Sequence, residues 1–138
     1  MTLIRSLPVI HWPEADRRRW EAACQPGRRL HRGGAAGHMK QTTRDDLAQR
    51  YGYFLDFIDR CSGLDADGSA AAYVTPERVE AYLKDLTTRR LSSVTIHGSI
   101  YKLRRTAEIL APAHDLAWLH QKGPTSRQVP RSKRPPDR

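Results

Sequence analysis

A single amphipathic stretch, residues 91–110, constrains the fold of this 138-residue chain more than any other part of its sequence. Its apolar residues recur in steps of four, three, four and three positions, at Ile96, Ile100, Leu103, Ala107 and Leu110. On an α-helix this spacing puts them in one stripe, and such a stripe is stable only when other elements cover it. The sequence therefore predicts a core helix that packs inside a larger helical domain.

The polar side chains of the same region indicate an anionic partner. Between residues 89 and 105 the chain carries five basic residues and no acidic one, and hydroxyl side chains gather at the predicted start of the helix. The unpaired N–H groups and the dipole at such a start favour phosphate. We therefore expect this helix to lie against DNA. The candidate contacts are Arg89, Arg90, Ser92, Ser93, Thr95, His97, Lys102, Arg104 and Arg105.

Four other segments have helical patterns, and no segment alternates for long enough with the period of two that a strand requires. They cover about residues 13–24, 42–62, 76–89 and 114–121, and the last of them is expected to pack against the bundle. The inward face of the second is predicted to consist of Leu47, Tyr51, Phe54, Leu55 and Ile58, and the segment that follows it is expected to be a polar connector. Either Thr42 or Thr43 can cap the second of these helices, and Gly63 can end it. Thr75 followed by Pro76 is a typical start for the third. The predicted fold is all-α, with about four core helices and a short N-terminal one.

The charge distribution divides the chain into one folded domain with an arm and a tail. We expect an N-terminal arm at residues 1–40, which holds the short helix and a glycine-rich loop, a helical domain at 41–121, and a disordered basic tail at 122–138. The net charge is +9, yet the central segment has ten basic residues against eleven acidic ones. The basic run at 89–105 is therefore a local patch and not a consequence of overall charge.

The composition disfavours several functional classes. No apolar run approaches the roughly 20 residues that cross a bilayer, and the N-terminus has no signal-peptide pattern, so we expect a soluble cytoplasmic protein with no membrane partner. Cys24 and Cys61 are far apart and lack metal-ligand spacing, which predicts no metal site. The motifs of hydrolases, metalloenzymes and phosphate-binding loops are missing, so no cofactor is expected.

Four sequence blocks, in order, resemble the N-terminal core-binding domain of bacterial tyrosine-type site-specific recombinases, the phage-integrase family. The blocks are WPEADRRRWEAA, TTRDDLAQRYGYFLDFI, VTPERVEAYLKDL and LSSVTIHGSIYKLRR, and the resemblance runs from about Trp12 to His120. It implies a SAM-like bundle of four or five helices that sits on one side of duplex DNA as half of a clamp. It also implies DNA contacts from Thr42, Thr43 and Arg44 and from the segment 92–105.

Two departures from the family limit what the resemblance implies. Gly98 and Ser99 stand where many relatives have larger polar or basic side chains, so we expect contacts to the DNA backbone ahead of contacts to bases. The catalytic signature, an early arginine, a His-x-x-Arg element and a late tyrosine, is also missing: no histidine precedes an arginine by three residues, and the last tyrosine is Tyr101. Only 17 residues follow Gln121. We therefore expect a truncated or stand-alone core-binding domain that binds double-stranded DNA without catalysis, associated with the bacterial nucleoid.

Two other functions fit the same sequence. The chain could be an interaction protein that pairs with a full-length recombinase and modulates its assembly, in which case the two would co-purify without DNA. It could also be a helix-turn-helix transcriptional regulator that uses residues 76–110, although the short turn of that motif is not evident from the sequence. A dimer on a palindromic operator would favour the regulator.

Overall fold

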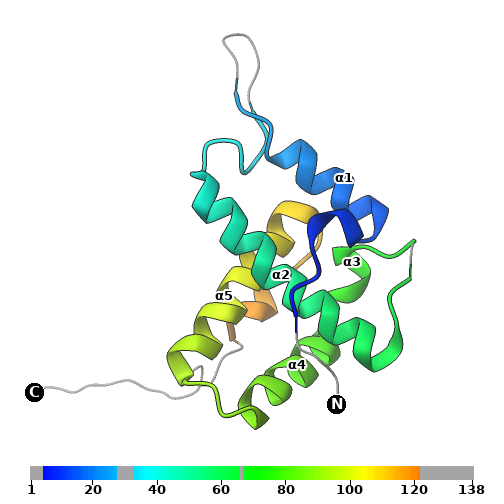
Figure 1. The fold of residues 1–138 in the computed structure, drawn as a ribbon, viewed down its shortest axis with the longest axis vertical. Helices are drawn as coiled ribbons and strands as arrows, with labels where there is room; N and C mark the ends of the chain where they lie inside the picture. Colours follow the sequence, from blue (N-terminus) through cyan, green and yellow to red (C-terminus); the bar gives the residue numbers. More distant parts are fainter. Residues whose placement is uncertain (1–4, 28–32, 66, 122–138) are drawn as a thin grey trace, which may run out of the picture.

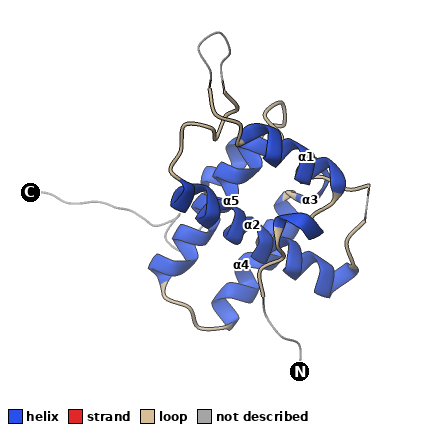
Figure 2. Ribbon diagram, turned by 45° about the horizontal axis from the view of Figure 1, so that its top comes forward, coloured by secondary structure: helices blue, strands red, loops and turns tan. Residues whose placement is uncertain are grey.

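The computed structural model describes residues 5–27, 33–65 and 67–121, and all regular structure within these ranges is helical (Figures 1 and 2). The predicted all-α fold is therefore confirmed, while the predicted disorder of residues 122–138 and part of the predicted glycine-rich loop lie outside the described residues. The α-helices are α1 (Glu14–Ala23), α2 (Gln41–Ser62), α3 (Ala70–Tyr73), α4 (Pro76–Thr88) and α5 (Ser93–Leu110). Two short 3-10 helices are η1 (Val9–His11) and η2 (Ala117–Gln121).

Helix α5 is the centre of the bundle, because it contacts α1, α2, α3, α4 and η2. All five residues of its predicted apolar stripe are buried, as the spacing requires. Ser99 and Thr106 are buried beside the stripe on the side that faces α2. The periodicity of residues 91–110 therefore predicted both the helix and the face that it buries.

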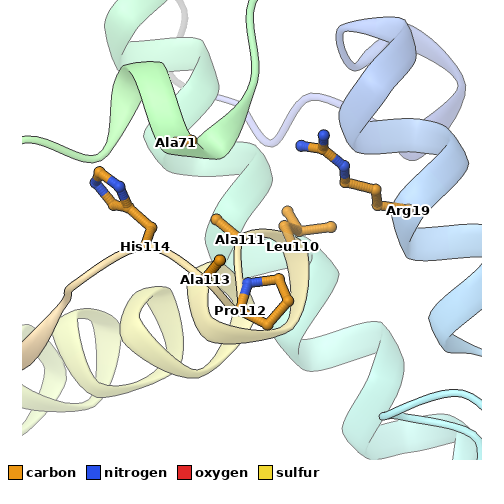
Figure 3. A pocket seen from close by; sticks show the side chains of 7 residues that line it. All are labelled: Arg19, Ala71, Leu110, Ala111, Pro112, Ala113 and His114. Atoms are coloured by element: carbon orange, nitrogen blue, oxygen red, sulfur yellow. The ribbon is translucent and has the colours of Figure 1, made fainter.

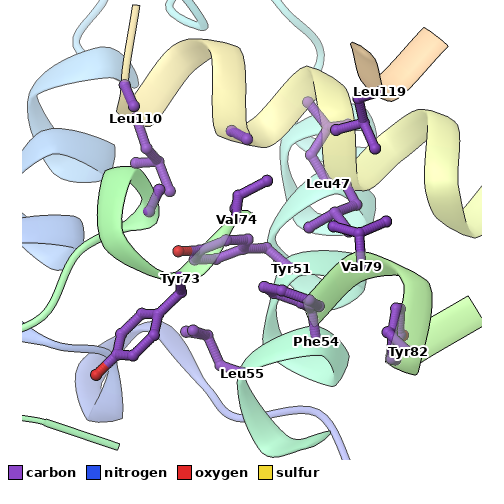
Figure 4. Close-up of a cluster of buried hydrophobic side chains, with 14 of the residues drawn as sticks. Leu47, Tyr51, Phe54, Leu55, Tyr73, Val74, Val79, Tyr82, Leu110 and Leu119 are labelled. Carbon is purple, nitrogen blue, oxygen red and sulfur yellow. The ribbon is translucent and has the colours of Figure 1, made fainter. Parts of the chain in front are cut away.

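Helix α2 supplies the aromatic part of the core (Figure 4). Its predicted inward face, Leu47, Tyr51, Phe54, Leu55 and Ile58, is buried throughout. The Phe54 ring meets Tyr82 of α4 edge-on, with ring centroids 5.3 Å apart. Burial of a large apolar side chain contributes about 1.5–3 kcal/mol, so these contacts fix how α2 and α4 lie against each other.

One buried polar group links the first three helices. The carboxylate of Asp16 in α1 accepts a hydrogen bond from the Tyr51 hydroxyl of α2 at 2.6 Å and one from the Ala70 backbone N–H of α3 at 2.8 Å. Desolvation by burial raises the pKa of Asp16 above its ordinary value, and the two hydrogen bonds partly oppose that shift. Desolvation and the neighbouring Asp16 raise the pKa of Tyr51 well above 10.0. Asp16 therefore joins three elements that are distant in sequence.

The predicted helix ends are partly confirmed. The Thr75 hydroxyl caps α4 by accepting from the Arg78 N–H at 3.2 Å, and Gly63 ends α2 with a φ of 81°. The predicted cap of α2 is wrong, because the helix begins at Gln41 and places Thr42 and Thr43 inside its first turn. The Arg44 N–H bonds to the Lys40 carbonyl at 3.0 Å, which starts the helix before either threonine.

Two short elements also differ from the prediction. The segment after α2 was expected to be a polar connector, yet it contains α3, which the Asp16 carboxylate holds by its first N–H. The segment 114–121 was expected to be an α-helix, but only Ala117–Gln121 is helical and its form is 3-10. Leu116 and Leu119 of this segment are nevertheless buried, so it packs on the bundle as expected.

Candidate nucleic-acid interface

The start of α5 is exposed and capped by its own hydroxyls. The Ser92 hydroxyl accepts from the Thr95 N–H at 3.1 Å and donates to the Thr95 hydroxyl at 2.9 Å. Ser92, Ser93 and Thr95 are all exposed, as is the neighbouring His97. In the first turn of an α-helix the N–H groups have no intrahelical acceptor. The cap uses only the N–H of Thr95, so those of Ser93 and Val94 are left for an external acceptor.

Three of the five basic residues of the patch have acidic partners. Arg89 Nε lies 3.2 Å from Asp85 Oδ2, close enough for an ion pair although the N–H is not aligned for a hydrogen bond. Arg104 Nη1 donates to Glu108 Oε2 at 3.2 Å. Lys102 pairs with Asp46 of α2. The acid-free run of the sequence is therefore partly neutralised by acids that lie outside residues 89–105.

Lys102 bonds to Asp46 of α2, which also lies 3.4 Å from Arg50. Burial alone would raise the pKa of the Asp46 carboxyl, but the hydrogen bond and charge of Lys102 and the charge of Arg50 hold that pKa below its ordinary value. Asp46 therefore stays ionised between two cations. Lys102 contributes to the α2–α5 contact as well as to the positive surface.

The two remaining cations, Arg90 and Arg105, have no acidic partner within the described part of the chain. Arg90 is exposed in the turn that precedes α5 and has a φ of 62°, in the left-handed region that non-glycine residues seldom adopt. Arg105 is partly exposed three turns along α5. These two residues give the surface its uncompensated charge.

The other predicted contacts, Thr42, Thr43 and Arg44, lie away from the start of α5. Helices α2 and α5 cross at a steep angle, and they touch where Leu47 meets Thr106 and Arg50 meets Ser99 (Figures 1 and 4). The first turn of α2 precedes this crossing, and Figure 1 shows it well apart from the start of α5. The structure does not bring the two predicted contact groups together in one cluster.

The Arg44 guanidinium is occupied by the protein itself. Its Nη1 donates to the Met39 carbonyl at 2.8 Å, and its Nη2 donates to Gln41 Oε1 at 2.8 Å. These bonds fasten the loop ahead of α2 to the helix. Arg44 therefore has a structural role, and a phosphate would have to displace these partners to reach it.

Two residues that the sequence reasoning passed over stand on the exposed face of α5. Val94 has 81% of its surface exposed and Tyr101 has 45%. Arg104 lies over the Tyr101 ring, 5.1 Å from its centroid. The signal that could have identified both residues is their position, since an apolar residue off the buried stripe of an amphipathic helix must face outward.

A pocket of about 460 Å³ lies at the other end of α5 (Figure 3). Its floor consists mainly of Leu110, Ala111, Pro112 and Ala113, while Arg19 reaches toward it from α1 and His114 lies on the opposite side. No carboxylate or nucleophilic side chain is among its lining residues. The pocket is about 25 Å along α5 from Ser93 and forms no part of the basic surface.

Within residues 5–27, 33–65 and 67–121, no three histidine, cysteine, aspartate or glutamate side chains are grouped to hold a metal ion. No helix in these ranges is long and apolar enough to span a membrane.

Comparisons with protein-family models, curated proteins and solved structures found no match to this chain. The function proposed below therefore rests on the chemistry of the exposed side chains and on the arrangement of the helices.

Proposed function

We propose that this chain binds duplex DNA without catalysis, through the exposed first half of α5, as a bacterial core-binding module of the tyrosine-recombinase type. The observation that carries the proposal is the start of α5, where exposed hydroxyls and unused N–H groups lie between the unpaired cations Arg90 and Arg105. Phosphate oxygens are the acceptors that such a helix start favours. The proposed contacts are with the DNA backbone in the first instance.

The ion pairs of the patch change the salt dependence that we expect for DNA binding. The logarithm of the binding constant falls with the logarithm of salt concentration with a slope of about −0.9 per neutralised phosphate. Five contacts, as expected from the sequence, would give a slope of about −4.5. If only Arg90 and Arg105 bind phosphates, the slope is about −1.8. Arg104, whose side chain is 17% exposed, would have to leave Glu108 to bind a phosphate and give an intermediate value.

A salt series measured by fluorescence anisotropy on a labelled duplex tests the proposal. We expect the double variant R90Q/R105Q to bind more weakly and to reduce the slope by about 0.9 for each residue. The control R17Q/R18Q makes the same change of charge on α1, where both arginines pair with glutamates. Unchanged binding by R90Q/R105Q, or an equal loss in the control, would refute the assignment to α5.

One observation favours a second function, a helix-turn-helix regulator. Only residues 89–92 separate α4 from α5, and Arg90 in this turn has the left-handed conformation that glycine often supplies there. The short turn that was not evident from the sequence is therefore present. In that motif the N-terminal residues of the second helix contact base edges. Sedimentation of the protein with palindromic duplexes separates the two functions, because a regulator binds as a dimer across two half-sites.

A further inference from the structure

The face of α5 opposite its buried stripe carries an unusual set of side chains. Val94, Gly98, Tyr101 and Arg105 follow one another in steps of four, three and four, which places them on one side of the helix. Val94 and Tyr101 are two of the three large hydrophobic side chains that are exposed in the described ranges. Apart from its chain neighbours and the nearby backbone of α5, a Cβ atom added to Gly98, between them, would have no atom within 4 Å. The face is therefore apolar at two points and open in the middle.

The stability of the fold does not require an apolar side chain at either position. Burial of such a side chain contributes about 1.5–3 kcal/mol, and Val94 forgoes nearly all of that gain. A β-branched residue is also a weaker helix former than alanine, so Val94 does not strengthen the first turn of α5 either. The Tyr101 ring, 45% exposed, carries Arg104 of the same helix over its face. The exposure of Val94 and Tyr101 therefore fits a role in contact with a ligand.

Duplex DNA presents one apolar group on its base edges, the C5-methyl group of thymine, which lies in the major groove. We propose that Val94 and Tyr101 contact thymine methyl groups there, and that this chain prefers thymine-containing sites. The inference rests on the proposed function. The major groove is about 12 Å wide and admits an α-helix, and Gly98 removes the side chain that would otherwise keep the middle of α5 away from the bases.

The charges around this face favour DNA over a second copy of the chain. Arg90 and Arg105 flank the two apolar residues and have no acidic partner in the described ranges, which suits the phosphates on either side of a groove. A symmetric dimer would place this same patch against itself and bring its cations together. Two apolar side chains also fall far short of the roughly 800 Å² per partner that a stable interface buries.

The methyl group of thymine can be removed from a duplex without changing the charge of the DNA, because deoxyuridine lacks only that group. We would measure anisotropy with a duplex of alternating adenine and thymine, and with the same duplex in which deoxyuridine replaces every thymine. Loss of two buried methyl contacts is expected to weaken binding roughly tenfold. In V94A the ratio of the binding constants for the thymine and deoxyuridine duplexes should shrink severalfold. Binding to the deoxyuridine duplex should be unchanged. The control I10A removes another exposed apolar side chain, from η1, at 73% exposure against 81% for Val94, and should keep the full ratio.

Each outcome of this experiment decides the inference. A thymine preference that V94A or Y101A reduces supports it, provided that both variants unfold at the temperature of the unmodified protein. Equal, salt-dependent binding to both duplexes overturns the inference and leaves the proposed function in place. Binding to neither duplex overturns both. A thymine preference that persists in V94A and Y101A assigns the methyl contact to other residues and also overturns it.

Discussion

Replacement of Tyr51 by phenylalanine removes a single oxygen atom from the centre of the bundle and tests how the buried carboxylate of Asp16 is stabilised. Tyr51 and Asp16 both have 0% of their surface exposed, and their hydrogen bond measures 2.6 Å. The aromatic ring stays in Y51F, so its contacts with Trp12 and Phe54 are retained. The carboxylate keeps the Ala70 N–H but loses its other partner. A hydrogen bond to a charged group contributes about 1.5–3 kcal/mol, so we expect Y51F to lose about 2 kcal/mol of unfolding free energy at neutral pH.

The pH dependence of the stability loss in Y51F provides a second, independent test of the prediction. The pKa of Asp16 is raised in the folded state by desolvation, so its protonation stabilises the fold below the unfolded pKa of 3.8, and this contribution is lost as pH rises through the folded pKa. The Tyr51 hydrogen bond opposes the rise, and Y51F should therefore raise the pKa of Asp16 further. The loss of stability in Y51F should be smaller near pH 4 than at pH 7, because a neutral carboxyl depends less on the missing donor.

Urea denaturation followed by tryptophan fluorescence measures both effects. Y53F is a matched control on the same helix, at a partly exposed tyrosine, and should change stability by no more than about 0.5 kcal/mol. In the D16N background the charge is gone, so Y51F should cost less than it does with Asp16 present. A loss below about 0.5 kcal/mol for Y51F at pH 7, or an equal loss at both pH values, contradicts the account given of Asp16.

Three further substitutions separate stability from binding. R90G should raise stability by about 1 kcal/mol, because glycine adopts a φ of 62° without strain, while it weakens DNA binding; a denaturation curve and an anisotropy titration should move in opposite directions. S92A removes the acceptor of the Thr95 N–H and should cost about 1 kcal/mol in urea denaturation, whereas S93A should cost much less. L103A empties a fully buried site in α5 and should cost about 2–5 kcal/mol by the same measurement; a loss comparable to that of the exposed-site variant V94A would contradict the assigned orientation of the helix.

Much of the fold followed from patterns within single segments. The stripe of α5, the inward face of α2 and the Thr75 cap of α4 were predicted because each depends on residues three or four positions apart. The start of α2 was not, because the helix begins at Gln41, ahead of both threonines, where Arg44 bonds to the Met39 carbonyl of the preceding loop. Helix α3 was missed for a similar reason, since its first N–H is held by Asp16, 54 residues away.

The candidate site shows the same division. The sequence by itself determined that α5 carries a buried stripe, a hydroxyl-rich start and basic residues, because the pitch of a helix converts spacing directly into faces. Only the tertiary structure decided which of those basic residues have no acidic partner and can bind an external anion. Asp46 reaches Lys102 across 56 residues, and the first turn of α2, which holds Thr42 and Thr43, lies well apart from the start of α5 (Figure 1). Charge pairing depends on distance in space, which no local pattern encodes. The packing of the helices therefore decided that Arg90 and Arg105 are the cations without an acidic partner in the described ranges, and that Val94 is exposed on the same surface.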